Sequence, residues 1–319
     1  MNKIVPVFFA ADDKYTPVLS VALTSLIAYV SNENHYDIHI LTEDITKQNE
    51  KIIRDIVAGK PNVTLFFDNI SDLIRADLAD LDTKLWYIET FYRVYIPRLF
   101  PQYDKAIYID CDLVLNGDIA ELYNVDLGDN YVAAAVERIM AQVPELTAYA
   151  NNYVGVGVHK YFNAGVLLMN SKLFRHIRLE DRFFEIYNTM KMDVAPDQDC
   201  LNVICAGRVK WLTNIWNKTP FSPNDQPLSD KEIRLYHYIL SSKPWKNRDA
   251  VAFEDKFWQH AKNTVFYKHF LDLKAKVTDA DIAKDQQRTV AIIELAGKMC
   301  TDEPVVEVMK KKRPVEAAS

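Results

Sequence analysis

Closely spaced cysteines, long apolar runs and an excess of basic residues are all missing from this sequence, and each absence excludes a class of protein. Its 4 cysteines show neither the spacing of a zinc site nor the density of a disulfide framework. No apolar run reaches the roughly 18 residues of a membrane-spanning helix, and the first residues lack a signal-peptide pattern. We therefore predict a cytoplasmic protein with reduced thiols.

The charge balance argues against a general nucleic-acid binder. Lys and Arg number 38 against 44 Asp and Glu, which gives a formal net charge of −6. An acidic protein can still hold an anionic ligand through a metal ion and a few local cations, so net charge does not decide the ligand. The 319 residues are 49% hydrophobic and 26% charged, as is usual for a soluble globular enzyme.

Strand-like and helix-like segments alternate through the N-terminal part of the chain. Strands are predicted at residues 4–10, 36–41 and 63–67, and helices at residues 16–30 and 46–57. Thr16 is expected to cap the first helix, with Pro17 at its first position. Alternation of this kind predicts a parallel α/β sheet, in which ligands collect at the carboxyl ends of the strands. Asp12, directly after the first strand, should lie at that edge.

A pair of acids interrupts the apolar run at residues 105–115. On one continuous strand, Asp110 and Asp112 would point to the same side, about 7 Å apart, and Cys111 would face the core. Buried carboxylates are costly unless a cation or protons neutralise them. The pair therefore predicts a divalent metal site at this edge, and an Asp pair that only caps the following turn is the alternative.

Three other candidates allow a structural explanation beside a functional one. Arg93, in an amphipathic segment at residues 87–99, is equally expected as a solvated helix-face arginine. His237 lies in an apolar strand, where a histidine is more often a satisfied core residue, but the nearby Lys243 favours a polyanionic ligand with a metal attached. Gln198 opens a helix between two acids, and the helix dipole explains those acids but not the glutamine.

The composition shifts beyond residue 265, so we divide the chain into residues 1–265 and a C-terminal helical extension at residues 266–319. An amphipathic helix is predicted at residues 278–299, and the chain ends in an irregular tail with four consecutive basic residues, 310–313. Each of them is worth about 1 kcal/mol against an anionic membrane surface. The tail therefore permits weak peripheral membrane contact, on the inner face of the membrane, but a solvated, disordered tail is the favoured interpretation.

Six separated segments, in order, resemble glycosyltransferase family 8, the retaining nucleotide-sugar transferases that include glycogenin and bacterial lipopolysaccharide galactosyl- and glucosyltransferases. The resemblance covers roughly residues 4–260. Its segments are Phe9-Ala10-Ala11-Asp12-Asp13-Lys14-Tyr15, Tyr92-Arg93-Val94-Tyr95-Ile96-Pro97, Tyr108-Ile109-Asp110-Cys111-Asp112 followed by Asn116-Gly117-Asp118-Ile119, Tyr161-Phe162-Asn163-Ala164-Gly165-Val166, Asp197-Gln198-Asp199, and His237-Tyr238 with Lys243-Pro244-Trp245.

The resemblance implies an α/β fold of the GT-A type, a Rossmann-like nucleotide-diphospho-sugar transferase domain with a mixed sheet. It implies transfer of a hexose from UDP-glucose or UDP-galactose to a saccharide acceptor, and no nucleic-acid partner. A lipopolysaccharide or another surface glycan is the expected acceptor, and self-glucosylation on tyrosine, as in glycogenin, is the less favoured one. No oligomeric state is predicted.

The resemblance also implies roles for individual residues. Asp110, Asp112 and His237 would bind Mn²⁺, with Mg²⁺ as the alternative ion, and two carboxylates with an imidazole suit Mn²⁺ better. Catalysis would involve Gln198 and Asp197. The residues expected to contact the donor are Asp12, Tyr15, Arg93, Asp110, Asn163, Ala164 and Lys243.

An amide is a poor nucleophile, so retention at Gln198 is expected to proceed by front-face attack through a short-lived ion pair, without a protein general base. Three residues depart from the family pattern. Lys14 stands where members often carry asparagine, Leu240 where they often carry glycine, and Glu137 where related galactosyltransferases have an aspartate in the acceptor pocket. The departure at Leu240 concerns the diphosphate loop, and the one at Glu137 concerns acceptor choice.

Three alternatives remain open at this point. A haloacid-dehalogenase-like phosphatase also has an Asp-x-Asp strand, but its downstream Gly-Asp-x-x-x-Asp set is not found here. A non-catalytic carbohydrate-binding protein on the same fold would have lost a metal ligand. A sugar-nucleotide pyrophosphorylase opens with a glycine-rich basic loop, whereas this chain has Ala11-Asp12-Asp13 there and only 8 glycines in total.

Overall fold

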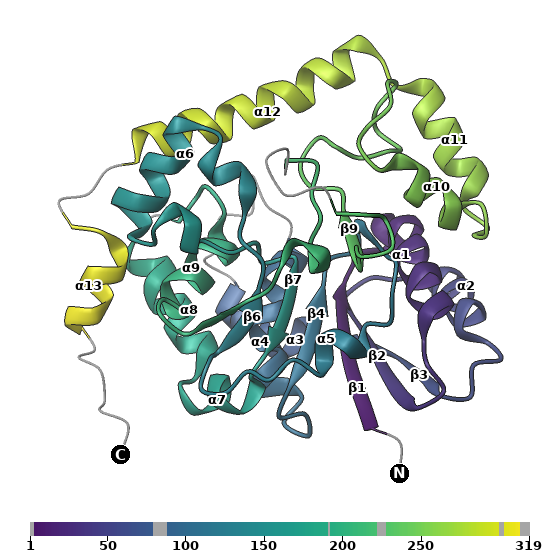
Figure 1. Cartoon of the computed structure of the whole chain (residues 1–319), viewed down its shortest axis with the longest axis horizontal. Helices are drawn as coiled ribbons and strands as arrows, with labels where there is room; N and C mark the ends of the chain where they lie inside the picture. The colour runs from purple at the N-terminus through teal and green to yellow at the C-terminus, as the bar shows by residue number, and fades with distance from the viewer. Residues whose placement is uncertain (1–2, 79–87, 191, 222–227, 300–302, 313–319) are drawn as a thin grey trace.

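A computed structural model describes residues 3–78, 88–190, 192–221, 228–299 and 303–312, so Tyr87, Cys300 and Arg313 lie outside the described residues. The described chain forms an α/β fold around a seven-stranded sheet (Figure 1). Its strands are β1 (Lys3–Ala10), β2 (Asn34–Thr42), β3 (Val63–Asn69), β4 (Ala106–Ile109), β6 (Val132–Ala134), β7 (Val166–Met169) and β8 (Val209–Trp211).

The strand order is β3-β2-β1-β4-β7-β6-β8. Neighbouring strands are parallel except that β7 is antiparallel to both β4 and β6. The predicted mixed α/β sheet is therefore confirmed. Because β7 runs against β4, the segment that precedes β7 arrives at the same edge as the segment that follows β4, and this brings residues 163–165 next to the acid pair.

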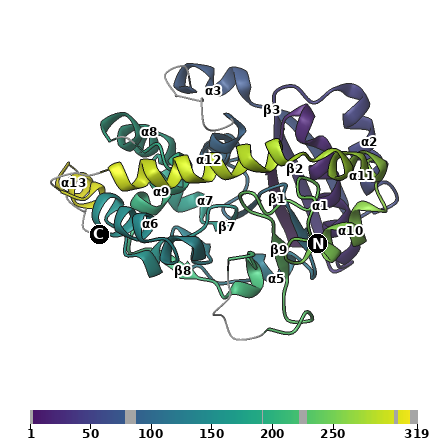
Figure 2. The same ribbon diagram turned by 90° about the horizontal axis from the view of Figure 1, so that it is seen from above.

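Helices cover both faces of the sheet (Figures 1 and 2). They are α1 (Thr16–Tyr29), α2 (Lys47–Val57), α3 (Ser71–Leu78), α4 (Tyr92–Leu99), α5 (Ala120–Tyr123), α6 (Pro144–Ala148), α7 (Ser171–His176), α8 (Leu179–Thr189), α9 (Pro196–Ile204), α10 (Glu254–Ala261), α11 (Tyr267–Lys276), α12 (Asp279–Lys298) and α13 (Val305–Lys312). None of the described helices combines the length and the apolar character needed to cross a lipid bilayer.

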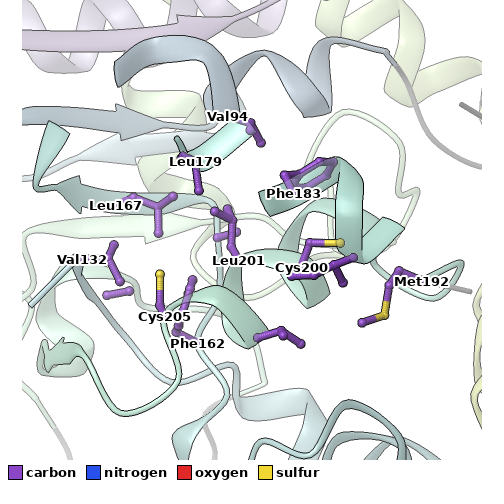
Figure 3. Packing of buried hydrophobic residues seen from close by; sticks show 14 of the residues in the cluster. Val94, Val132, Phe162, Leu167, Leu179, Phe183, Met192, Cys200, Leu201 and Cys205 are labelled. Atoms are coloured by element: carbon purple, nitrogen blue, oxygen red, sulfur yellow. The ribbon is translucent and has the colours of Figure 1, made fainter. Parts of the chain in front are cut away.

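Alternate residues of β1 pack into two different hydrophobic clusters, as the two-residue period of a strand requires. Val7 and Phe9 pack in a cluster that includes α1, whereas Phe8 packs in a cluster that includes α4. Figure 3 shows part of the second cluster, where Leu167 of β7 meets Leu201 of α9. Burial of both faces explains why the strands read as continuous apolar runs.

The first helix begins differently from the prediction. Asp12 caps a short 3-10 turn, Asp13–Tyr15, and its Oδ1 accepts a hydrogen bond from the backbone nitrogen of Tyr15 at 2.7 Å. This turn leads into α1, whose N-cap position is held by Tyr15 and not by Thr16. Among the described residues, the buried Oγ1 atom of Thr16 finds no hydrogen-bond partner. Thr16 does not cap α1 because the tight turn after β1 already places it inside the helix.

The apolar run at residues 105–115 was predicted to form one strand, and this prediction is wrong. Strand β4 ends at Ile109, and the chain leaves the large sheet at the two acids. Residues Leu113–Leu115 then form β5, which pairs with β9 (Leu235–His237) in a separate two-stranded sheet. This break lets both carboxylates stay at the edge of the sheet, and it places His237 directly opposite Leu113.

The C-terminal helices pack against the rest of the chain. Helix α12 runs from α11 to α6 (Figures 1 and 2), and Thr278 and Asp281 form the capping box at its start. Val306 of α13 is buried in the core cluster. The predicted irregular tail is wrong for residues 310–312, which form the last turn of α13, and Lys310 pairs with Glu307 at 2.7 Å.

Candidate active site

The carboxyl ends of β1 and β4 bring the predicted site residues to one edge of the sheet. Asp12 follows β1 and Asp110 follows β4, and these two strands are parallel neighbours. Tyr15 lies in the turn that Asp12 caps. The backbone nitrogen of Asp110 donates to the carbonyl of Gly165 at 2.9 Å, which ties the acid pair to the turn before β7.

Two carboxylates and one imidazole form a possible metal site. The ligand atoms of Asp110, Asp112 and His237 all lie within 4.8 Å of one another. His237 Nε2 is 3.2 Å from Asp112 Oδ1 and 3.7 Å from Asp110 Oδ2. This set fits a divalent ion that accepts both oxygen and nitrogen ligands, such as Mn²⁺.

The backbone next to this site leaves no room for a side chain at residue 165. A Cβ atom on Gly165 would clash with the imidazole of His237 and would lie 2.5 Å from Asp110 Oδ2. The glycine therefore allows the turn before β7 to approach the two ligands closely.

A lysine contacts the acid pair directly. The ammonium group of Lys243 is paired with Asp112 Oδ2 and also donates to the backbone carbonyl of Tyr238. Burial alone would raise the pKa of Asp112, but the charge of Lys243 and the hydrogen bond with His237 outweigh it, so the pKa is held below its ordinary value. Asp112 thus stays ionised, as a metal ligand must.

Arg93 is buried between two carboxylates. Its exposed fraction is 5%, and its guanidinium lies 3.1 Å from Asp110 Oδ1 and 3.3 Å from Asp197 Oδ2. Burial raises the pKa of Asp197 to about 6, and the charge of Arg93 opposes that shift. The interpretation of Arg93 as a solvated helix-face residue is therefore wrong, because it balances buried negative charge.

Gln198 and Ala164 contact each other at the same edge. Gln198 Oε1 accepts a hydrogen bond from the backbone nitrogen of Ala164 at 2.9 Å, and the carbonyl of Ala164 accepts one from Arg93 at 2.5 Å. The side chain of Asn163 is also engaged, with Nδ2 donating to Glu137 Oε2 at 2.5 Å. The sequence-predicted residues Arg93, Asp110, Asn163, Ala164, Asp197 and Gln198 therefore form one connected network.

Asp199 points into the core, which its position in a helix's first turn did not indicate. Its carboxylate accepts hydrogen bonds from Tyr161 at 2.5 Å, from Tyr149 at 2.8 Å and from the backbone nitrogen of Ala195 at 2.9 Å. Burial raises its pKa to about 7 in spite of these bonds. Gln198 Nε2 in turn lies 3.4 Å from the hydroxyl of Tyr161.

The raised pKa of Asp199 predicts a pH dependence of stability. The folded state binds the proton more tightly than the unfolded state, so the stabilisation is complete below pH 4 and is lost as the pH rises to about 7. We expect the free energy of unfolding to fall over this interval, by about 1.4 kcal/mol for each unit of pKa difference.

Urea unfolding at pH 4.5 and pH 7.5 measures this effect. Asn in the Asp199→Asn variant keeps an acceptor for Ala195 and Tyr149 but does not titrate, so the decline should be smaller in the variant. Asp197 and Glu137 contribute in the same direction in both proteins. If the free energy of unfolding fell equally in the wild type and the variant between these two pH values, Asp199 would ionise normally.

Leu240 has the backbone conformation of the glycine that the family pattern leads one to expect. Its φ is +51°, in the left-handed region, and its side chain is 39% exposed. The backbone at residue 240 therefore lies in the region where glycine is favoured, although the residue is a leucine. An L-residue in this region costs roughly 1–2 kcal/mol.

We expect Leu240→Gly to leave the free energy of unfolding unchanged or to raise it by up to about 1 kcal/mol, because relief of strain exceeds the added entropy of the unfolded chain. The matched control is Leu271→Gly in α11, where Leu271 is similarly exposed and a helical glycine should cost about 1 kcal/mol. Urea titration measures the free energy of unfolding of both variants. If both variants lost the same amount of stability, strain at residue 240 would be refuted.

Sequence reasoning missed several residues of the site. Tyr108 donates to Asp110 Oδ1 at 2.9 Å and lies under the guanidinium of Arg93. Asn217 contacts both His237 and Asn163. Tyr108 belongs to the Asp-x-Asp segment of the resemblance but was given no role, and the only signal for Asn217 was its place in an Asn-rich loop. Cys111 is buried as predicted, with Sγ 3.3 Å from the carbonyl of Ala10.

The mixed sheet and the acid pair that follows β4 agree with the GT-A fold that the resemblance implied. Residues 6–249 match the family described as "Glycosyl transferase family 8", and the chain belongs to this family. Membership decides against the phosphatase and pyrophosphorylase alternatives.

Relatives and solved structures agree with this assignment. A putative glycosyltransferase of Haemophilus influenzae is 29% identical over 256 residues, which cover 76% of this chain and 73% of that protein. A lipopolysaccharide 1,2-glucosyltransferase of Escherichia coli is 23% identical and covers 79% of this chain and 76% of its own length. The structure of galactosyltransferase LgtC in complex with donor and acceptor sugar analogues has a TM-score of 0.67 at 25% identity, over 82% of this chain and 96% of LgtC.

Proposed function

We propose that this protein is a retaining hexosyltransferase that moves glucose or galactose from a UDP-sugar to a saccharide acceptor, with Mn²⁺ as the metal ion. The observation that carries the proposal is the convergence of Asp110, Asp112 and His237, whose ligand atoms lie within 4.8 Å of one another. A non-catalytic protein on the same fold would have no need to keep all three ligands at this spacing. The named relatives act on lipopolysaccharide or bind sugar analogues, which favours a surface glycan as acceptor.

In this proposal the residues of the donor site have separate tasks. Asp12 and Tyr15 hold the uridine, and Lys243, already beside Asp112, holds the diphosphate. Asp110, Asp112 and His237 would hold the ion, which would supply Lewis-acid stabilisation of the leaving diphosphate. Arg93, Asn163, Ala164 and Asp197 position the donor sugar.

Gln198 is then the residue nearest to the reacting carbon. Its amide oxygen is engaged by the backbone nitrogen of Ala164 at 2.9 Å, and an amide is a poor nucleophile in any case. We infer that Gln198 stabilises developing positive charge on the sugar, while the leaving phosphate accepts the acceptor's proton. A covalent sugar trapped on Asp197 or Gln198 would contradict this mechanism.

The proposal keeps a cytoplasmic location and a division at residue 265. Cys111, Cys200 and Cys205 are buried free thiols, which agrees with a reducing compartment. Weak peripheral membrane contact through the basic end of α13 also remains a proposal. Lys310 and Lys311 are each paired with a glutamate, which lowers the charge that they offer to a membrane.

Hydrolysis of a panel of UDP-sugars tests the proposed function. We expect slow release of UDP from UDP-glucose or UDP-galactose with Mn²⁺, weaker release with Mg²⁺ and none with a chelator. The preferred donor then serves in transfer assays with candidate glycan acceptors. Turnover that a chelator does not change would contradict the metal site.

A further inference from the structure

Asn217 lies directly behind the proposed metal ligand His237. Its side chain is 4% exposed, and it follows a 3-10 turn, Asn214–Trp216. The backbone nitrogen of His237 donates to the carbonyl of Lys218 at 2.9 Å, which holds the two segments together. The side chain of Asn217 bridges His237 Nδ1, at 3.0 Å, and Asn163 Oδ1, at 2.8 Å.

The backbone nitrogen of Gly165, which can only donate a hydrogen bond, fixes the orientation of the side-chain amides of Asn163 and Asn217. The backbone nitrogen of Gly165 lies 2.9 Å from Asn163, so the amide atom of Asn163 that it meets must be the oxygen. The other amide atom of Asn163 is then the nitrogen, and it meets an acceptor, Glu137 Oε2, at 2.5 Å. Both contacts of Asn163 agree on one orientation.

The orientation of Asn163 determines that of Asn217. Because Asn163 Oδ1 cannot donate, the atom of Asn217 that contacts it must be the amide nitrogen, Nδ2. Asn217 therefore presents its oxygen to His237 Nδ1. An amide oxygen only accepts, so Nδ1 of His237 must carry a hydrogen.

We propose that Asn217 is a positioning residue that keeps a hydrogen on Nδ1 of His237, so that Nε2, which lies 3.2 Å from Asp112 Oδ1, is the ring nitrogen left to bind the metal ion. The chain of hydrogen bonds begins at the backbone of Gly165 and passes through Asn163. This inference rests on the proposed metal site, because Nε2 is the atom that faces both carboxylates. Partners of this kind orient metal-bound histidines and raise their affinity for the ion.

Mn²⁺ affinity, measured by electron paramagnetic resonance of the full chain, tests the role of Asn217. We expect Asn217→Ala to raise the dissociation constant about 10–100-fold. Asn217→Asp keeps an acceptor for the Nδ1 hydrogen but loses the donor to Asn163 Oδ1, so it should recover only part of that loss. The matched control is Asn62→Ala, since Asn62 is also buried and donates two hydrogen bonds, but far from the site. The proposal would be overturned if the Ala and Asp variants lost the same affinity for Mn²⁺, or if the Ala variant lost none.

A second measurement decides the proposal even if the variants do not fold. Nitrogen-15 NMR of histidine-labelled wild-type protein, before Mn²⁺ is added, identifies the protonated ring nitrogen. The sequence has 7 histidines, and a His237→Gln spectrum assigns the signals of His237. A ring that keeps its hydrogen on Nδ1 when Nε2 has lost its own supports the proposal, and a neutral ring with its hydrogen on Nε2 overturns it. Wild-type protein that fails to bind Mn²⁺ would refute the metal site, a separate result from the NMR outcome.

Discussion

Replacement of Asp112 by Asn is expected to lower the Mn²⁺-dependent hydrolysis of the preferred UDP-sugar by about 10²–10³-fold, the loss typical when one preorganised electrostatic contact to the developing charge is removed. The substitution removes one of three ligand groups that converge within 4.8 Å. It also leaves the ammonium group of Lys243 without its carboxylate partner in a partly buried site. The value of kcat/KM at saturating Mn²⁺ measures the effect.

A matched variant separates loss of the ligand from a general effect of the substitution. Asp126 is exposed, and its Oδ1 accepts a hydrogen bond from the backbone nitrogen of Gly128 at 3.0 Å, which asparagine can preserve. Asp126→Asn should therefore keep wild-type turnover. Undiminished, chelator-sensitive turnover in Asp112→Asn would remove Asp112 from the metal site.

Replacement of Gly165 by Ala is expected to impair both metal binding and stability. The added Cβ would occupy space now filled by His237 and the carboxylate of Asp110. His237 is 2% exposed and Asn217 holds its ring, so the ring cannot move aside freely. Overpacking of this kind costs about 1–3 kcal/mol, and displacement of two ligands should reduce turnover as strongly as loss of Asp112.

Mn²⁺ affinity and the melting temperature of Gly165→Ala measure the two parts of this prediction. Gly157→Ala is the matched control, because a Cβ at that position meets no atom within 4 Å and its φ is not in the left-handed region. We expect Gly157→Ala to keep wild-type affinity for Mn²⁺. Wild-type affinity in Gly165→Ala would show that the two ligands can shift together without losing the site.

Local sequence patterns predicted most elements of the fold because the physical cause of each element is local. The apolar runs of β1, β2 and β3 could be read directly, and so could the helical pattern of α12. The break between β4 and β5 could not be read, because apolar residues on both sides of the acids suit one strand as well as two. Pairing of β5 with β9, more than 100 residues later in the chain, decides between them.

The sequence alone determined the chemical types in the site, namely two acids, an imidazole, a lysine and an amide that the six ordered segments pick out. Tertiary structure decided how those groups are connected. Arg93 became a buried partner of Asp110 and Asp197, and Asn217 became the partner of His237. These contacts join residues that are distant in the chain, and burial and charge balance at one edge of the sheet select them. A pattern of neighbouring residues carries no information about either quantity.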